Sequence, residues 1–110
     1  MAEPTPLGTF EEQVLLAVLR SADDAYGMHV RRELEQVTGR TVAIGAVYAT
    51  LDRLEAKSLV ASRRVDAESG SRRMFRVTAD GARALAGTRA MRERLWQGVR
   101  LGPLLTGDGA

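Results

Sequence analysis

Apolar residues recur at helical spacing in three segments in the first half of the chain, which predicts three helices. The first covers Phe10–Arg20 and has a broad apolar face, typical of a helix packed on several sides. The second covers Ala25–Val37 and the third covers Ala43–Lys57. The residues expected to face the core are Tyr26, Val30, Leu34 and Val37 in the second helix, and Val47, Leu51 and Leu54 in the third.

Polar residues and glycine mark the ends of these helices. Thr9 followed by Glu12 predicts a capping box, in which each side chain bonds a free backbone N–H at the helix start. Gly39 follows the second helix and suits the left-handed conformation that often ends a helix. Residues 1–8 hold two prolines and a glycine, so we expect a flexible lead-in.

The hydrophobic period changes after the third helix. Residues 59–65 and 72–77 favour β-strands, and the polar stretch 66–71 between them predicts a hairpin with a longer loop. Phe75 and Val77 alternate onto the face expected to point inward.

A long final helix is predicted over residues 79–100, with Thr78 as its N-cap, and residues 101–110 are expected to be a flexible tail. Three helices followed by a hairpin is the order of a winged helix-turn-helix, here residues 9–78. The predicted fold class is therefore mostly α with a small β-hairpin, a winged helix-turn-helix plus a C-terminal helix.

Charge is unevenly distributed along the 110 residues, whose net charge is +2. Residues 1–50 hold four arginines and seven acidic residues, a net of −3, whereas residues 51–100 hold twelve basic and six acidic residues, a net of +6. This polarity indicates a surface for an anion such as nucleic acid, although a mixed, solvated surface explains the counts equally well.

The residue types exclude most catalytic and metal chemistry. The chain has no cysteine, a single histidine, His29, and no glycine-rich phosphate loop, so we expect no enzyme, no metal site and no cofactor. No apolar run approaches the roughly 18 residues that span a bilayer, and the start of the chain lacks the features of a signal peptide. A cytoplasmic protein without a membrane partner is expected.

The outward face of the third helix carries small residues, among them Gly45, Ala46 and Ala49. Small side chains let a helix backbone come close to a partner. A DNA groove is one such partner, and another helix is the alternative.

Arginines flank the predicted turn of the hairpin on both strands: Arg63, Arg64, Arg72 and Arg73. Guanidinium groups pair with phosphate through charge-assisted hydrogen bonds. In a winged helix-turn-helix the third helix enters the major groove and the hairpin lies over phosphates, so the pattern predicts binding of double-stranded DNA. The alternatives are a solvated hairpin, whose charges protect its edges from aggregation, and a protein-interaction module that binds no DNA.

Several local motifs together resemble the PadR family of bacterial transcriptional regulators over roughly residues 7–90. The tyrosine and glycine that open the second helix, and the pattern of the third helix and of the second strand, are similar to the family's. These motifs are Leu7-Gly8-Thr9-Phe10-Glu11-Glu12, Tyr26-Gly27-Met28, Gly45-Ala46-Val47-Tyr48, Leu51-Asp52-Arg53-Leu54-Glu55 and the run from Arg72 to Gly81.

The resemblance implies a dimeric repressor that binds a pseudo-palindromic operator and dimerises through the C-terminal helix, residues 79–100. It also implies that Tyr48 and the third helix contact DNA. The chain departs from the family at Ala43, where a capping Ser or Thr is common, and at Ser58, where a helix-ending Gly is common.

Few side chains of the third helix could read bases. Thr50, Arg53 and the hydroxyl of Tyr48 are polar, and arginine to guanine is the commonest specific contact. Ala46 could contact a thymine methyl group, with DNA shape sharing the readout.

The C-terminal helix offers Met91, Leu95, Trp96 and Val99 for a dimer interface. Some members of the family bind flat aromatic compounds between subunits, so Trp96 is also a candidate for stacking against a small aromatic effector.

Overall fold

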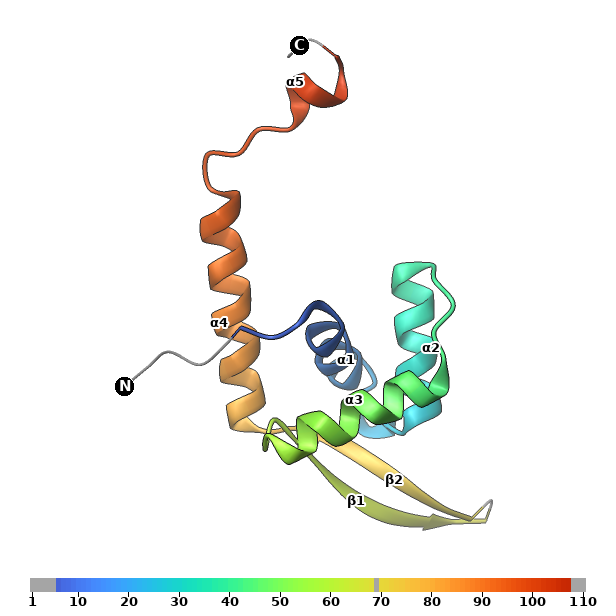
Figure 1. Ribbon diagram of the computed structural model, residues 1–110. Helices are drawn as coiled ribbons and strands as arrows, with labels where there is room; N and C mark the ends of the chain where they lie inside the picture. Colours follow the sequence, from blue (N-terminus) through green and yellow to red (C-terminus); the bar gives the residue numbers. More distant parts are fainter. Residues whose placement is uncertain (1–5, 69, 108–110) are drawn as a thin grey trace.

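The computed structural model describes residues 6–68 and 70–107 and has the predicted fold class, mostly helical with one hairpin (Figure 1). Three helices and a short 3₁₀ turn precede the hairpin, and two helices follow it. The elements are α1 (Thr9–Arg20), η1 (Ala22–Asp24), α2 (Gly27–Thr38), α3 (Ile44–Ala56), β1 (Val60–Ala67), β2 (Gly70–Val77), α4 (Ala79–Trp96) and α5 (Gly102–Leu105).

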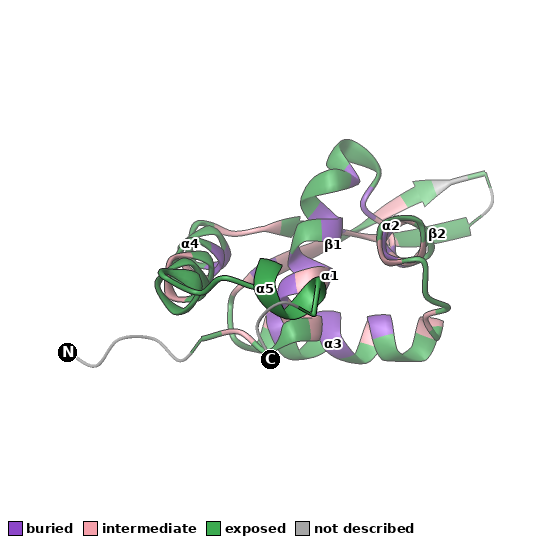
Figure 2. Cartoon of the chain, turned by 90° about the horizontal axis from the view of Figure 1, so that it is seen from above, coloured by how far each residue is buried: buried purple, intermediate pink, exposed green. Residues whose placement is uncertain are grey.

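The hydrophobic core lies where α1, α2 and α3 meet the base of the hairpin. Its largest fully buried side chains include Leu15, Leu51 and Leu54, and Figure 2 shows buried positions along α1 and the inner side of α3. The predicted stripe of α3 is buried throughout. That of α2 is buried at Val30 and Leu34, but Val37 is 59% exposed because it lies in the last turn, where it lines an open apolar groove between α1 and α2.

The start of α1 differs from the predicted capping box by one residue. Gly8 is the N-cap, and its N–H donates to the Glu11 carboxylate at 3.1 Å. Glu12 has a different partner, because the Arg92 guanidinium of α4 donates to it at 2.6 Å. The Leu7 N–H also donates to the Thr88 hydroxyl of α4, so the beginning of α1 is fastened to α4.

The two strands pair antiparallel, with Val60 opposite Val77 and Ala67 opposite Gly70, so both reach further toward the turn than predicted. Phe75 is buried and Val77 packs against the core, which confirms the predicted inward face. The Phe75 N–H also donates to the Ala25 carbonyl at 2.8 Å. This bond ties the second strand to the segment that leads into α2.

The final helix is shorter than predicted. Thr78 is its N-cap, as expected, and accepts a hydrogen bond from the Gly81 N–H at 3.0 Å. The helix ends at Trp96 instead of reaching Arg100, because Gln97 leaves the helical conformation and Gly98 has a positive φ of 78°. Val99 therefore lies beyond the helix. In the expected flexible tail, residues 102–105 form the short helix α5.

The close approach of α4 to the hairpin depends on Gly81. A Cβ at this position would overlap the Leu59 carbonyl oxygen and come within 2.8 Å of a Val77 methyl group. We therefore expect Gly81→Ala to lower the free energy of unfolding by about 1–3 kcal/mol, the usual cost of overpacking. Urea denaturation measures this change.

Gly87, in the same helix, is the matched control because a Cβ there would meet nothing within 4 Å. Gly87→Ala should raise the free energy of unfolding by up to about 1 kcal/mol through helix propensity. Equal stabilisation by both substitutions would contradict the close approach.

Candidate nucleic-acid interface

Helix α3 and the hairpin lie at one end of the molecule, and α5 lies at the opposite end (Figure 1). Burial of Val47, Leu51 and Leu54 fixes which side of α3 faces the core. The opposite side is exposed at Gly45, Ala46 and other small residues, as the sequence predicts.

Among the residues predicted to read bases, Thr50 lies on the buried side of α3. It is only 1% exposed, and its hydroxyl accepts a hydrogen bond from the Arg53 guanidinium at 3.0 Å. Thr50 belongs to the inner side of the helix, one turn before Leu54, and cannot reach a base edge. Ala46 and Arg53 are exposed, so they are the predicted residues that remain accessible on this face.

Tyr48 is half-buried, and its ring packs against α2. A Cβ on Gly27 would overlap the ring of Tyr48, so only glycine allows this contact. Within residues 6–68 and 70–107, the Tyr48 hydroxyl has no hydrogen-bond partner. The ring is therefore held at a fixed position while its hydroxyl stays available.

Arg73 forms ion pairs with two carboxylates of α3, which the sequence did not reveal. Its guanidinium donates to Asp52 at 3.0 Å and to Glu55 at 2.8 Å, both on α3, and stacks over the Phe75 ring. The side chain is 28% exposed. Arg73 thus fastens the hairpin to α3, and the expectation that it grips phosphate is replaced by this role.

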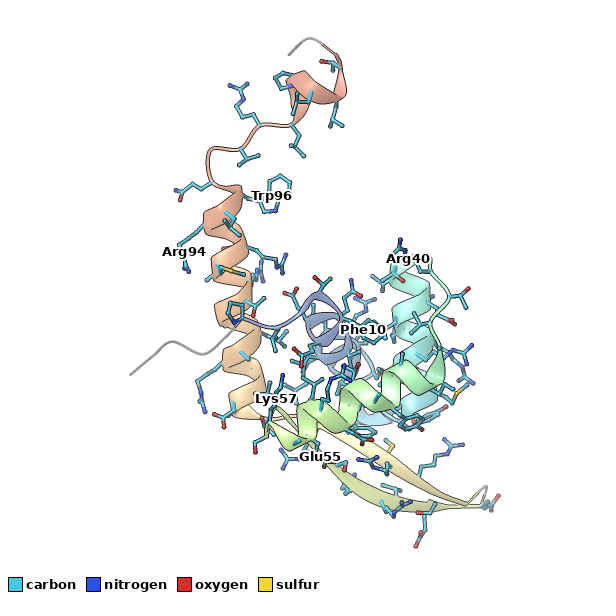
Figure 3. All side chains as sticks on the ribbon, in the orientation of Figure 1. Phe10, Arg40, Glu55, Lys57, Arg94 and Trp96 are labelled. Atoms are coloured by element: carbon cyan, nitrogen blue, oxygen red, sulfur yellow. The ribbon has the colours of Figure 1, made fainter. Side chains whose placement is uncertain are left out.

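Glu55 is the acceptor at the centre of this attachment and lies on the side of α3 that faces the hairpin (Figure 3). The Ser62 hydroxyl of β1 donates to it at 2.6 Å. This hydrogen bond and the charge of Arg73 hold the pKa of Glu55 below its usual 4.5, against the opposing effect of desolvation. The carboxylate form therefore favours the attached hairpin.

The other predicted arginines of the hairpin are exposed. Arg72 lies over the ring of Tyr26, with 4.4 Å from its guanidinium carbon to the ring centroid. Within the described part of the chain, Arg63 and Arg64 form no hydrogen bond or ion pair. The two point to opposite faces of the hairpin, because neighbouring residues of a strand alternate.

A cleft of about 410 Å³ lies between the start of α2, helix α3 and the hairpin. Its wall combines aromatic and basic side chains from all three elements, and no acidic residue is among them. The lining residues are Tyr26, Met28, Arg32, Tyr48, Arg64, Ser71, Arg72 and Arg73.

Three basic or aromatic residues near the hairpin were not among the predicted site residues. Tyr26 was assigned to the core and Arg32 was given no role, yet both line the cleft. Arg76 is exposed on the same face as Arg63. Alternation along 72–77 could have placed Arg76 with Arg72, whereas the cleft depends on tertiary packing that no local pattern records.

The predicted dimer residues differ in their exposure. Leu95 is 68% exposed and Trp96 is 56% exposed, and Trp96 lies at the end of α4 in Figure 3. Val99 is exposed beyond the helix, while Met91 is half-buried. Apolar side chains thus gather on the part of α4 that extends past α1.

The described residues provide neither a metal site nor a membrane-spanning helix. Within ranges 6–68 and 70–107, no three His, Asp or Glu side chains are placed to hold a metal ion. The helices of the same ranges include none that is long and apolar enough to cross a membrane.

Comparison with known families identifies one match in sequence. The model of the transcriptional regulator PadR-like family matches residues 15–87. A search of curated proteins gave no match.

Solved structures with similar folds include two PadR proteins. The PadR family transcriptional regulator of Eggerthella lenta is 28% identical, with a TM-score of 0.64 over 86% of this chain and 84% of that one. The PadR-like transcription factor of Bacteroides fragilis is 24% identical, with a TM-score of 0.72 over 82% and 85%. RosR of H. salinarum is 23% identical, with a TM-score of 0.69 over 94% of both chains. The last two matches show likeness of fold.

The attachment of the hairpin at Glu55 predicts a pH-dependent stability. Because its pKa is lowered in the folded protein, its contribution is present above pH 4.5 and is lost as the pH falls through the lowered pKa. Glu55→Gln should therefore be less stable than the parent at pH 7, and the difference should shrink below pH 4.5. Chemical denaturation across this pH range measures both effects.

Asp66→Asn serves as the control for loss of one exposed carboxylate on the hairpin. It should change stability at pH 7 by no more than about 0.5 kcal/mol. A Glu55→Gln variant that matches the parent at pH 7 would argue against the attachment.

Proposed function

Because the chain belongs to the PadR-like family of transcriptional regulators, we propose that it binds double-stranded DNA as a homodimer and represses transcription in the cytoplasm. The family consists of regulators and not of enzymes, in agreement with the sequence prediction. The observation that carries the proposal is the exposed face of small residues on α3, which lies at the same end of the molecule as the arginines of the hairpin.

The α3 helix is proposed to enter the major groove. The groove is about 12 Å wide and accepts an α-helix, and the exposed Gly45 and Ala46 leave its backbone free to approach closely. Arg53, on the same helix, is proposed to read guanine, and Ala46 to contact a thymine methyl group. Tyr48 contributes its hydroxyl from the edge of this face.

The hairpin is proposed to supply phosphate contacts through Arg63, Arg64 and Arg72, with Arg73 reserved for attachment to α3. Each phosphate that is neutralised releases counterions, so binding should weaken steeply as salt rises. These contacts position the protein on the duplex, while specificity depends on α3.

A homodimer is proposed because the end of α4 presents apolar side chains to solvent, Leu95 and Trp96 among them. Burial of each such side chain contributes about 1.5–3 kcal/mol. To enter successive major grooves on one side of the duplex, the two α3 helices of such a dimer must lie roughly 34 Å apart, one turn of DNA. The corresponding operator is pseudo-palindromic, and bound repressor would block the promoter that contains it.

The proposal extends to a planar aromatic effector at Trp96. Its ring is 56% exposed in the single chain, and stacked aromatic pairs contribute about 0.5–1.5 kcal/mol beyond area burial. A compound held between two such rings would change how the subunits meet, and so the spacing of the α3 helices.

Binding of a random duplex at low salt separates this function from a protein-interaction module, which should bind almost none. Within such an assay, Ala46→Glu should lower affinity at least about tenfold, because it places bulk and negative charge on the proposed groove face. Folding should be preserved, since Ala46 is exposed in the first turn of its helix. Fluorescence anisotropy with a labelled duplex provides the measurement.

Ala82→Glu is the matched control, since Ala82 is exposed near the start of α4. It adds the same charge in a similar helical position and should leave affinity within about twofold. If both variants bind as the parent does, α3 is not the DNA-binding helix.

The dimer is tested by Leu95→Arg, which adds a charge where the two α4 helices are proposed to meet. We expect a parent dimer and a variant that sediments as a monomer in analytical ultracentrifugation. Gln36→Arg adds the same charge on an exposed position of α2 and should remain dimeric. A Leu95→Arg variant whose dimer dissociates with the same constant as the parent dimer would reject the interface.

With the same two proteins, planar aromatic compounds should quench the fluorescence of Trp96 in the dimeric parent. They should leave the fluorescence of the monomeric Leu95→Arg variant unchanged.

A further inference from the structure

An apolar groove of about 430 Å³ lies between the second halves of α1 and α2. Two of its lining residues are charged, Arg20 and Glu33, and they form an ion pair with each other at 3.7 Å. The groove therefore presents no unbalanced charge to an occupant. Three large apolar side chains of its walls are exposed in the single chain: Leu16, Leu19 and Val37.

The C-terminal residues 101–105, here called the α5 arm, expose a second apolar surface. Leu104 is 69% exposed and Leu105 is 80% exposed, and Leu101 is exposed as well. No charged residue occurs between positions 101 and 107. A helix as short as α5 is not stable by itself, because isolated helices below about 12–15 residues are marginal in water. The arm therefore needs an apolar surface on which to pack.

The two surfaces together account for most of the large apolar side chains that the described part of the chain exposes. Ten such residues are exposed, and nine of them lie on the groove walls or between positions 95 and 105; Met28 is the exception. We propose that, in the homodimer, each α5 arm lies in the groove between α1 and α2 of its partner. The proposal rests on the proposed homodimer and adds a second contact to it. Because a two-fold dimer uses the same surfaces of both copies, it covers both grooves and both arms at once.

The connection between α4 and the arm has the length that such an exchange requires. The Arg92 guanidinium donates to Glu12, so the end of α4 lies close to the start of α1. Five residues, 97–101, lead from α4 to α5 and span up to roughly 17 Å. Leu16 lies one helical turn beyond Glu12, about 6 Å along α1. Where two α4 ends meet, as proposed, the arm of each copy therefore starts within reach of the groove of the other.

Two observations favour the groove of the partner over that of the same chain. Figure 1 shows α5 past the end of α4, away from α1 and α2 of its own chain. In addition, Leu95 and Trp96 alone would bury only roughly 250 Å² per copy, since a whole aromatic side chain buries about 150–250 Å². A specific interface buries about 800 Å² per partner. Exchange of the arms supplies apolar area that the ends of the α4 helices lack.

The stability of the dimer tests this contact through one substitution on each surface. Leu104→Arg places a charge on the arm, and Leu19→Arg places one on the groove wall. Each should raise the dissociation constant of the dimer in analytical ultracentrifugation at least about tenfold, because burial of an unpaired charge is costly. Both residues are exposed in the single chain, so the circular dichroism spectrum of each variant should match that of the parent.

Met28→Arg is the matched control, because it adds the same charge at the exposed apolar residue that lies outside both surfaces. As an ordinary surface substitution, it should leave the dissociation constant of the dimer within about twofold of the parent value.

A mixture of the two variants shows which groove the arm occupies. The Leu19→Arg chain keeps an intact arm, and the Leu104→Arg chain keeps an intact groove, so a mixed dimer contains one undamaged pair. We expect the mixed dimer to form at least about fivefold more tightly than either variant homodimer, because its undamaged pair buries no charge. If each arm occupied the groove of its own chain, mixing would restore nothing.

The outcomes separate the two proposals. A Leu104→Arg or Leu19→Arg dimer as stable as the parent dimer, or one weakened no more than Met28→Arg, would overturn the arm contact while the homodimer stands. A mixed dimer no tighter than the variant homodimers would overturn the exchange between copies. A parent protein that sediments as a monomer would instead overturn the proposed homodimer, and the arm contact with it.

Discussion

Burial of one side of α3 is the constraint on which the rest of the molecule depends. Val47, Leu51 and Leu54 are fully buried, and each contributes about 1.5–3 kcal/mol relative to an exposed position. Rotation of the helix about its axis would expose them and is therefore opposed by several kilocalories per mole. The buried side consequently fixes which side of α3 faces outward, so Gly45, Ala46 and Ala49 can be as small as an incoming partner requires.

Polar contacts then set the hairpin against this fixed helix. Glu55 accepts from both Arg73 and Ser62, which joins α3 to both strands at once. One arginine, Arg73, holds the hairpin, whereas Arg63 and Arg64 form no hydrogen bond or ion pair within residues 6–68 and 70–107. This division explains how a basic hairpin keeps a defined position although its positive charges repel one another.

Local sequence patterns predicted the main helices, the hairpin and most of the core, since periodicity records which side of an element is buried. They failed where a residue's partner comes from a distant part of the chain. The Thr9–Glu12 pattern fits a capping box, yet Glu12 pairs with Arg92, 80 residues away. Thr50 is polar but sits on the buried side of α3, where Arg53 satisfies its hydroxyl. Arg73 was grouped with the other arginines because its carboxylate partners lie on another element.

The attachments of α4 (Ala79–Trp96) extend as far as Arg92, and this has a mechanical consequence for the end of the helix. Gly81 abuts the hairpin, while Thr88 and Arg92 bond to the chain around the start of α1. Beyond Arg92 only the last turn of α4, residues 93–96, remains, and within the described residues it forms no hydrogen bond or ion pair with another element. In the proposed dimer, the two α4 helices would meet at their C-terminal ends. A small tilt of one helix against the other would then move the whole of each subunit, because the rest of α4 is attached to its own subunit. An effector at the meeting point could then change the distance between two distant helices without deforming either domain.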